Sequence, residues 1–251
     1  MKPCEFLVAD LSNSNTKLAP ATSETVGDRV TIPTRDVTPE ALLEAAATWQ
    51  GWDRMVVASV VPEKCEAFRE AFGKRLLEVT PDLELGVAIE FPDPSGIGPD
   101  RLVNAAGCAA IHGYPAVVVD FGTAVTFDIL SNQPAYVGGV IAPGLDLMRE
   151  YLHSRTALLP LIDLEEPPSP IGKSTKEAML AGAVIGYRGL VREIILSIAE
   201  KMEVDPKKQL KVVATGGYSE LIAKGVEEID AVDQDLTLQG LRIVGSLNPR
   251  R

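Results

Sequence analysis

The amino-acid sequence predicts an α/β fold built from two similar halves. Short apolar runs rich in Val and Ile alternate with longer helical segments, which is the pattern of α/β layering. A strand–Asp–turn–strand pattern also occurs twice, about half a chain apart, which indicates an internal duplication. The 251 residues are enough for one large or two small domains whose cores need no disulfides or structural metal.

The first half of the chain begins with a buried strand and continues with helices that carry clear start signals. Thr38 is placed to cap a helix, and Pro39 suits the first helical position. Continuous apolar runs indicate strands buried on both faces. The predicted strands are 5–10, 54–61 and 83–89, and the predicted helices are 38–49, 62–72 and 100–112. A loop rich in Pro and Gly, 91–98, precedes the last helix.

The second half repeats this alternation. Its small β-branched runs favour strands, and its longest apolar-periodic stretch favours one long helix. The predicted strands are 116–120, 125–129, 136–141 and 209–214, and the predicted helices are 144–154, 175–202 and 219–224. The proline-rich stretch 164–172 is predicted to be a loop.

The duplication is most detailed at two turns. Residues 6–16 align with residues 116–126 at an offset of 110 residues. In both segments an Asp ends an apolar strand, small and polar residues follow, and a Thr closes the pattern. A chance match of two short strands is the alternative, but the turn residues match as well as the strands, which favours duplication.

These two turns have the chemistry of a phosphate site. Asp10 and Asp120 end buried strands, where α/β proteins bind ligands, and backbone N–H groups in such turns bind anions. Asp10, Asn13 and Lys17 suit a magnesium-bound triphosphate, because a carboxylate holds Mg²⁺ or its waters and a lysine neutralises phosphate oxygens. An ordinary hairpin turn with a surface lysine is the alternative, and the second copy at Asp120 favours phosphate binding.

A third turn, Thr215-Gly216-Gly217, ends another apolar strand and precedes a helix. Glycines there let a nucleotide base or ribose come close, and a helix N-terminus favours anions. A simple strand-to-helix turn has the same sequence, so this motif gains weight only from its position after the two Asp turns.

Asp100 and Arg101 begin a predicted helix, directly after Gly98 and Pro99. A carboxylate near the positive end of a helix and beside an arginine is expected to stay ionised. It could accept the proton of a substrate hydroxyl that attacks phosphorus, while Arg101 grips a substrate carboxylate or holds Asp100 in place. An N-terminal Asp beside a solvated Arg is the alternative.

Several function classes receive no support from the sequence. The net charge of -11 and the pI of about 4.8 speak against binding of a nucleic-acid backbone. Cys4, Cys65 and Cys108 are too widely spaced for a disulfide framework or a zinc site. No P-loop and no GxSxG motif occurs. The apolar runs are too short for a signal peptide or a membrane span, so we expect a cytoplasmic protein without membrane or nucleic-acid partners.

Taken in order, the motifs resemble type III pantothenate kinase, a family of the sugar kinase/actin superfamily. The resemblance extends from residue 6 to about residue 221. It is carried by DLSNSNTK (10–17), SVVP (59–62), FPDPSGIGPDR (91–101), DFGTAVTFD (120–128), GGVIAPG (138–144), KST (173–175) and ATGGY (214–218). The order GxDR, DFGTAxTxD and GGxIxPG is much more specific than any single motif.

The resemblance implies two actin-like (ribonuclease H-like) subdomains with an ATP cleft between them. The first, 1–115, would carry the ATP-phosphate loop, and the second, 116–251, the cation, adenosine and dimer-contact elements. The implied reaction is ATP-dependent phosphorylation of pantothenate to 4′-phosphopantothenate, the first step of coenzyme A synthesis. The implied cofactors are Mg²⁺ with ATP and a monovalent cation, K⁺ or NH₄⁺, and the implied assembly is a homodimer.

The functional positions of the family correspond to residues of this chain. Asp100 is similar to the catalytic base, Asp120 to the ligand of the monovalent cation, and Asp10 to a residue that serves Mg-ATP. The predicted ATP-binding residues are Asp10, Leu11, Ser12, Asn13, Ser14, Asn15, Thr16, Lys17, Thr123, Gly216 and Gly217. The predicted substrate-binding residues are Phe91, Gly98, Pro99, Asp100, Arg101 and Thr175, the last with help from a dimer partner.

Two sites depart from the family pattern. The family's first loop usually reads DxGNT, and here Ser12 replaces the glycine and Ser14 the threonine. If position 12 needs φ > 0, a serine costs about 1 kcal/mol there and crowds the phosphates. Phe91 stands where the family usually has a tyrosine, so one hydroxyl contact to substrate is lost.

The charged residues of the predicted site are all retained, which favours an active kinase. Two alternatives remain open. One is a catalytically degenerate relative that acts as a regulatory accessory protein through protein contacts. The other is a kinase or phosphatase of the same superfamily that acts on another small substrate.

Overall fold

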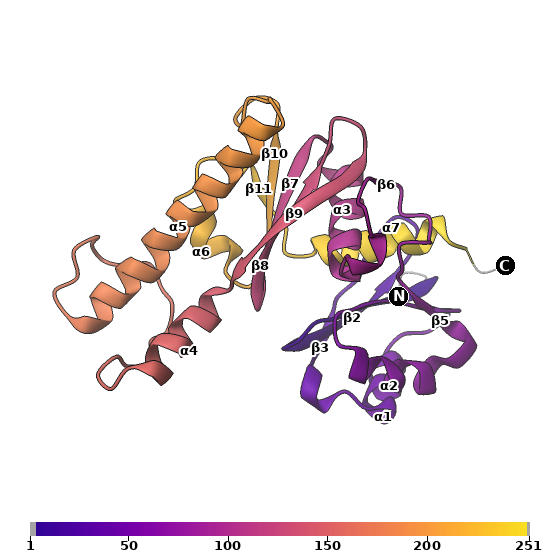
Figure 1. Ribbon diagram of the computed structural model, residues 1–251. Coiled ribbons are helices and arrows are strands. Elements are labelled where there is room, and N and C mark those ends of the chain that lie inside the picture. Colours follow the sequence, from indigo (N-terminus) through magenta and orange to yellow (C-terminus); the bar gives the residue numbers. More distant parts are fainter. Residues whose placement is uncertain (1–3, 250–251) are drawn as a thin grey trace. The chain divides into compact units, whose positions relative to one another are not determined.

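Two sheets with the same strand pattern organise the chain (Figure 1). The computed structural model describes residues 4–249. The first sheet has the order β3-β2-β1-β4-β5. Its strands are β1 (Phe6–Leu11), β2 (Asn15–Ala21), β3 (Val30–Pro33), β4 (Met55–Ser59) and β5 (Leu76–Glu78).

The second sheet has six strands in the order β11-β10-β7-β8-β9-β6. They are β6 (Ala88–Ile89), β7 (Ala116–Phe121), β8 (Ala124–Leu130), β9 (Ala135–Pro143), β10 (Lys211–Gly216) and β11 (Ala231–Val232). In each sheet the leading strand, β1 or β7, pairs antiparallel with the next strand and parallel with a later one, β4 or β10. This shared topology confirms the prediction of two similar α/β halves.

The two leading hairpins differ by one residue in the turn. In the first hairpin Leu11 pairs with Thr16, and in the second Phe121 pairs with Val125, so the first turn is one residue longer. The sequence alignment of Thr16 with Thr126 was therefore wrong beyond the turn. Opposite Asp120 stands Thr126, whereas the equivalent place opposite Asp10 is taken by Lys17.

Helices follow the strands in both halves. They are α1 (Pro39–Ala46), α2 (Pro62–Phe72), α3 (Pro99–Ile111), α4 (Leu145–Arg155), α5 (Thr175–Lys201), α6 (Ser219–Ala223) and α7 (Leu236–Leu247). Short 3₁₀ helices are η1 (Thr34–Asp36), η2 (Gly73–Arg75) and η3 (Pro94–Gly96). Thr38 caps α1 as predicted, because its side chain accepts a hydrogen bond from the Ala41 amide. The first six helices lie close to their predicted bounds.

The predicted strand 83–89 was wrong except at its end, since only Ala88–Ile89 is extended and paired. Residue Glu84 instead exchanges hydrogen bonds with the Asn248 side chain, which accepts from its amide and donates to its carbonyl oxygen. A side chain thus satisfies backbone groups that a neighbouring strand would otherwise satisfy. The strand β2 had been predicted without bounds, as the second strand of the strand–Asp–turn–strand pattern, and β3, β5, β11 and the helix α7 had not been predicted.

The chain forms two compact units. The first contains the described residues up to His112, residues 134–137, and the described residues from Asp235 onward, and the second contains 113–133 and 138–234. The predicted boundary at residue 115 concerns the duplicated halves and stays a prediction. The compact units differ from the duplicated halves because α7, from the end of the chain, packs on α3 and β1 of the first unit.

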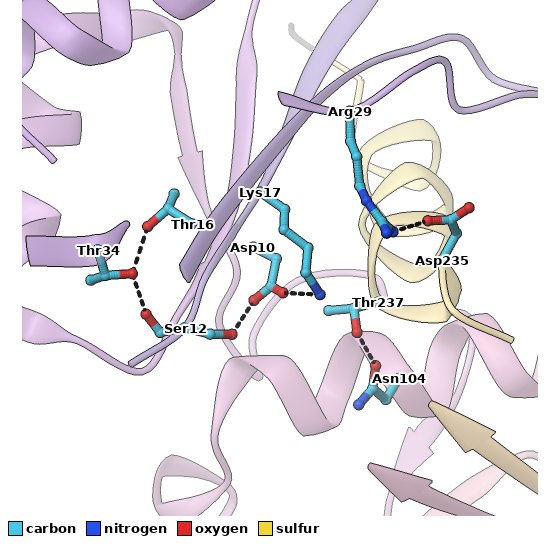
Figure 2. Close-up of polar contacts among 9 residues, drawn as sticks. All are labelled: Asp10, Ser12, Thr16, Lys17, Arg29, Thr34, Asn104, Asp235 and Thr237. Carbon is cyan, nitrogen blue, oxygen red and sulfur yellow. Dashed lines mark hydrogen bonds and ion pairs between the residues drawn. The ribbon is translucent and has the colours of Figure 1, made fainter. Parts of the chain in front are cut away.

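Polar contacts hold α7 against the rest of the first unit. The Thr237 hydroxyl donates to the buried Asn104 side chain on α3 over 2.9 Å (Figure 2). Arg29 pairs with Asp235 at 2.5 Å. Buried Arg54 lies over the Phe6 ring, 4.8 Å from its centroid, and donates to the Gly245 carbonyl near the end of α7. These contacts link α7 and the residue before it to α3, to the residue before β3 and to the residue before β4.

Each unit has its own apolar core. In the first unit, buried side chains of β1 and β4 pack with those of α1 and α2, among them Leu7, Leu42 and Phe68. In the second unit, buried side chains of β7 and β10 pack with the inner face of α5, which includes Tyr187 and Val191. The leading strands are therefore rigid supports for the turns at their carboxyl ends. Within residues 4–249, none of the helices is long and apolar enough to span a bilayer.

Candidate active site

Asp10 lies at the end of β1, and its carboxylate is held by two side chains of the following hairpin (Figure 2). The Ser12 hydroxyl donates to Oδ1 over 2.6 Å, and the Lys17 ammonium lies 3.7 Å from Oδ2. The hairpin register places Lys17 directly opposite Asp10, so both side chains project from the same face of the sheet. The structure thus brings together the predicted carboxylate and the predicted lysine.

Burial dominates the electrostatics of Asp10. Its residue is only 4% exposed, and this desolvation raises the pKa of the carboxyl above its ordinary value. The charge of Lys17 and the hydroxyl of Ser12 act in the opposite direction but do not cancel the effect. A further cation beside this buried carboxylate would favour its ionised form and lower its pKa.

Ser12 fits its position without backbone strain. Among the described residues, Glu203 is the only residue other than glycine with a positive φ. The conditional cost assigned to a serine at position 12 therefore does not apply. The hydroxyl, which glycine would lack, instead supports the Asp10 carboxylate.

Asp100 occupies the first turn of α3, after Gly98 as N-cap and Pro99 as the first helical residue. Its Oδ1 accepts a hydrogen bond from the Arg101 amide at 2.8 Å. A Cβ at position 98 would lie 2.5 Å from that same oxygen, so a larger residue there would have to displace the Asp100 carboxylate. The carboxylate is thereby folded back over the helix start.

Burial raises the pKa of the Asp100 carboxyl, and the nearby negative charge of Asp10 raises it further. The Arg101 amide and the Arg101 charge oppose this rise without outweighing it. The prediction that the helix start and arginine govern this group therefore missed the larger influence of burial. Two acidic groups of one unit lie within electrostatic reach of each other.

Arg101 lies against Tyr136, a buried residue that the sequence motifs did not include. Its guanidinium lies over the Tyr136 ring, 5.7 Å from the centroid, and Phe91 meets the same ring edge-on at 6.2 Å. Tyr136 is fully buried on β9, where it pairs with Ile89 of β6. The predicted substrate residues Phe91 and Arg101 thus share one buried neighbour, which only the strand pairing reveals.

Asp120 and the glycine turn come together in the second unit. The parallel pairing of β7 with β10 sets Thr215 beside Asp120 and Gly216 beside Phe121. Gly216 has φ +90, and a Cβ there would lie 2.6 Å from an Asp120 carboxylate oxygen. Only glycine suits this position, both for its backbone conformation and for its closeness to the carboxylate.

The other predicted residues of the second unit lie on exposed segments. Thr123 is exposed at the β7–β8 turn, where its carbonyl accepts a hydrogen bond from the Gly144 amide at 3.1 Å. Gly217 is exposed, and its amide donates to the Phe121 carbonyl at 3.1 Å. Thr175 is exposed at the first position of α5, after Ser174, whose side chain caps that helix.

The two sheets with their acidic turns have the actin-like α/β fold, and this class is defined before any particular family. Solved structures of the actin-like superfamily share the fold at low identity. A protein of Campylobacter jejuni named as a Baf family transcriptional activator superposes with a TM-score of 0.63 at 20% identity, covering 95% of this chain and 96% of that one. A ROK hexokinase of Thermus thermophilus superposes with a TM-score of 0.53 at 12% identity, covering 95% and 97%.

Sequence comparison identifies the family. The family model described as type III pantothenate kinase matches residues 6–197. Two relatives carry that name: one of Akkermansia muciniphila, 51% identical with 97% of this chain and 99% of the relative covered, and one of Methylacidiphilum infernorum, 42% identical with 98% and 90% covered. The chain belongs to the type III pantothenate kinase family.

Proposed function

We propose that this chain transfers the terminal phosphoryl group of ATP to the primary hydroxyl of pantothenate. The product is 4′-phosphopantothenate, and the reaction begins coenzyme A synthesis. Family membership supplies the substrates, and the observation that carries the proposal is a pair of carboxyl groups in one unit, the buried Asp10 and the half-buried Asp100. We place this reaction in the cytoplasm, where ATP-dependent biosynthesis takes place.

Asp100 acts as the general base in this proposal. A base for an alcohol must be unprotonated at working pH yet basic enough to take the developing proton. Burial and the charge of Asp10 raise the pKa of Asp100, which increases its basicity. The Arg101 amide fixes one carboxylate oxygen, so the other oxygen is left to face the substrate hydroxyl.

Asp10 and Lys17 bind the charged end of ATP. Phosphoryl transfer depends mainly on positioning and charge neutralisation, and Lys17 supplies a positive charge 3.7 Å from the Asp10 carboxylate. The donor set fits Mg²⁺, which typically binds through one or two carboxylates together with substrate phosphates and waters. Mg²⁺ bound by Asp10 would neutralise phosphate charge, and the N–H groups of the turn residues 12–14 would hold phosphate oxygens.

Arg101 binds the carboxylate of pantothenate. A guanidinium recognises a carboxylate by parallel hydrogen bonds, and its position over the Tyr136 ring restricts its rotamers. Phe91, at 36% exposed, offers an apolar surface on the other side of its contact with Tyr136. Gly98 and Pro99 shape the turn that carries the base, and Thr175 adds a polar contact at the start of α5.

The second unit carries the other predicted ATP-binding residues and a predicted cation site. Thr123 and the glycine pair Gly216 and Gly217 bind the nucleotide in this proposal. Asp120 binds a monovalent cation, K⁺ or NH₄⁺, because the absence of a side chain at Gly216 leaves room beside its carboxylate. In the Asp120→Asn variant, dependence on these cations should be lost, and an unchanged response would contradict the assignment.

A homodimer is part of the proposal. The second unit exposes large apolar side chains on α4 and in the segment that follows it. Among them are Tyr151 (63% exposed), Leu158 (88%) and Ile171 (75%). Exposed apolar side chains of this kind favour contact with another chain. A single monomeric species at all concentrations in analytical ultracentrifugation would contradict the proposed homodimer.

A coupled ADP-release assay tests the proposed function. With ATP, Mg²⁺ and K⁺ present, ADP should appear only when pantothenate is added. ADP release with a sugar or acyl acceptor but not with pantothenate would favour another kinase of the superfamily. No turnover at high ATP would favour the degenerate, regulatory reading. The structural likeness to the Campylobacter jejuni protein concerns the fold and does not favour that reading.

A further inference from the structure

Thr34 belongs to none of the predicted motifs, yet it contacts the predicted phosphate turn at three points (Figure 2). It begins η1 directly after β3 and is 3% exposed. Its hydroxyl donates to the Ser12 carbonyl oxygen over 2.6 Å, and its amide donates to the Ser14 carbonyl oxygen over 3.0 Å. The hydroxyl oxygens of Thr34 and Thr16 lie 3.0 Å apart.

The directions of these bonds follow from the number of protons. A hydroxyl group donates one hydrogen bond and accepts up to two. The single proton of the Thr34 hydroxyl is used on the Ser12 carbonyl, so the buried Thr16 hydroxyl donates to Thr34. With a donor on one side and an acceptor on the other, the Thr34 hydroxyl has one defined orientation.

Holding the Ser12 carbonyl also orients the next amide. In a planar trans peptide the N–H points opposite to the C=O, so the Asn13 N–H points away from Thr34. Asn13 is exposed at the tip of the turn, where an anion can reach its amide. The side chain of Ser12 meanwhile donates to the Asp10 carboxylate over 2.6 Å. One hydroxyl on η1 therefore orients both the Asn13 amide and Ser12, the residue that supports Asp10.

We propose that Thr34 is a positioning residue for ATP, which aligns the Ser12–Asn13 peptide for a phosphate oxygen without touching the nucleotide itself. This inference rests on the proposed kinase function, since it names a further residue of the same site. A purely structural role, in which Thr34 only joins η1 to the hairpin, makes a different prediction. It would lower stability while leaving the two substrates' KM values in the same ratio.

The test compares Thr34→Val, which keeps the shape and loses the hydroxyl, with Thr34→Ser, which keeps the hydroxyl. Thr34→Val should raise the KM for ATP and weaken binding of Mg-ADP, measured by calorimetry, each by about five- to tenfold. The KM for pantothenate should change by less than about twofold, because Thr34 orients only the ATP side. Thr34→Ser should restore both ATP values to within about twofold of the wild type. Thr22→Val, in the exposed turn where Thr22 pairs with Thr25, is the matched control and should leave all values unchanged.

An unchanged KM for ATP in Thr34→Val would overturn the inference, as would a Thr34→Ser variant as impaired as Thr34→Val. If Thr34→Val fails to fold, Thr34→Ala and Thr34→Ser form a second pair that differs only in the hydroxyl. Equal Mg-ADP affinity in that pair would also overturn it. Failure of the proposed function is distinguishable, because the wild type would then show no pantothenate-dependent ADP release at all.

Discussion

Asp10 and Asp100, which are 90 positions apart in the sequence, lie within electrostatic reach of each other in the first unit. Each carboxyl is buried enough that desolvation raises its pKa, and the charge of Asp10 raises that of Asp100 further. Such a pair is costly unless a cation or a proton offsets one of the charges. The arrangement therefore favours a site that holds a cation and moves a proton.

The raised pKa of Asp100 predicts the acid limb of the pH profile. A general base is inactive when protonated, so kcat/KM should fall as the pH decreases through the raised pKa of the free enzyme. The fall should begin at a higher pH than the ordinary titration of an aspartate. A profile that stays flat down to the ordinary aspartate range would contradict the assignment of Asp100 as the base.

The buried charge of Asp10 predicts a conflict between stability and activity. Because its pKa is raised in the folded state, its contribution to stability is greatest below the unfolded-state pKa and is lost as the pH rises through the folded-state pKa. Asp10→Asn should therefore have a free energy of unfolding at neutral pH that is higher by about 1 kcal/mol, with greatly reduced turnover. Denaturant titration measures this difference, and a clear loss of stability would contradict it.

The hydrogen bond from Ser12 to Asp10 predicts the effect of restoring the family's glycine. Ser12→Gly removes a 2.6 Å hydrogen bond to a carboxylate whose pKa is already raised by burial. The KM for ATP should rise about tenfold or more, since a hydrogen bond to a charged group contributes about 1.5–3 kcal/mol and about 1.4 kcal/mol corresponds to a factor of ten. A lower KM would mean that the serine crowds the phosphates after all.

The contact between Gly216 and Asp120 predicts a selective loss in the second unit. Gly216→Ala places a Cβ near the Asp120 carboxylate and forces an alanine into a backbone region that suits glycine. The free energy of unfolding should fall by about 1–3 kcal/mol. Gly217→Ala, where a Cβ would meet no atom within 4 Å, is the control and should leave stability near that of the wild type. Equal effects of the two substitutions would contradict this account.

Much of the fold could be predicted because its main strands are continuous apolar runs. The leading strands β1 and β7 are buried along nearly their whole length, so their composition alone marks them as strands. The strands β5 and β11 have three and two residues, which is too short for any periodicity to show. Helix α7 was missed although its buried residues Leu241 and Val244 recur at helical spacing, because two glycines interrupt the pattern.

The candidate site was predictable where the interacting residues are close in the sequence. It was not predictable where the fold brings together residues that are far apart in the sequence. Asp10 and Lys17 belong to one hairpin, so their motif contains both partners. Tyr136 on β9 meets Arg101 on α3, 35 positions away in the sequence, and Thr34 reaches Ser12 through the pairing of β3 with β2. No local signal marks either residue, since a buried Tyr and a Thr after a proline are common in any α/β protein.

Identification of the product with the wild type and Asp100→Asn side by side tests the central claim most directly. Mass spectrometry of reactions with ATP, Mg²⁺, K⁺ and pantothenate should detect 4′-phosphopantothenate from the wild type. The Asp100→Asn variant, folded by circular dichroism, should form it about 10²- to 10⁴-fold more slowly. Equal rates from the two proteins, or no phosphorylated pantothenate from the wild type, would contradict the account.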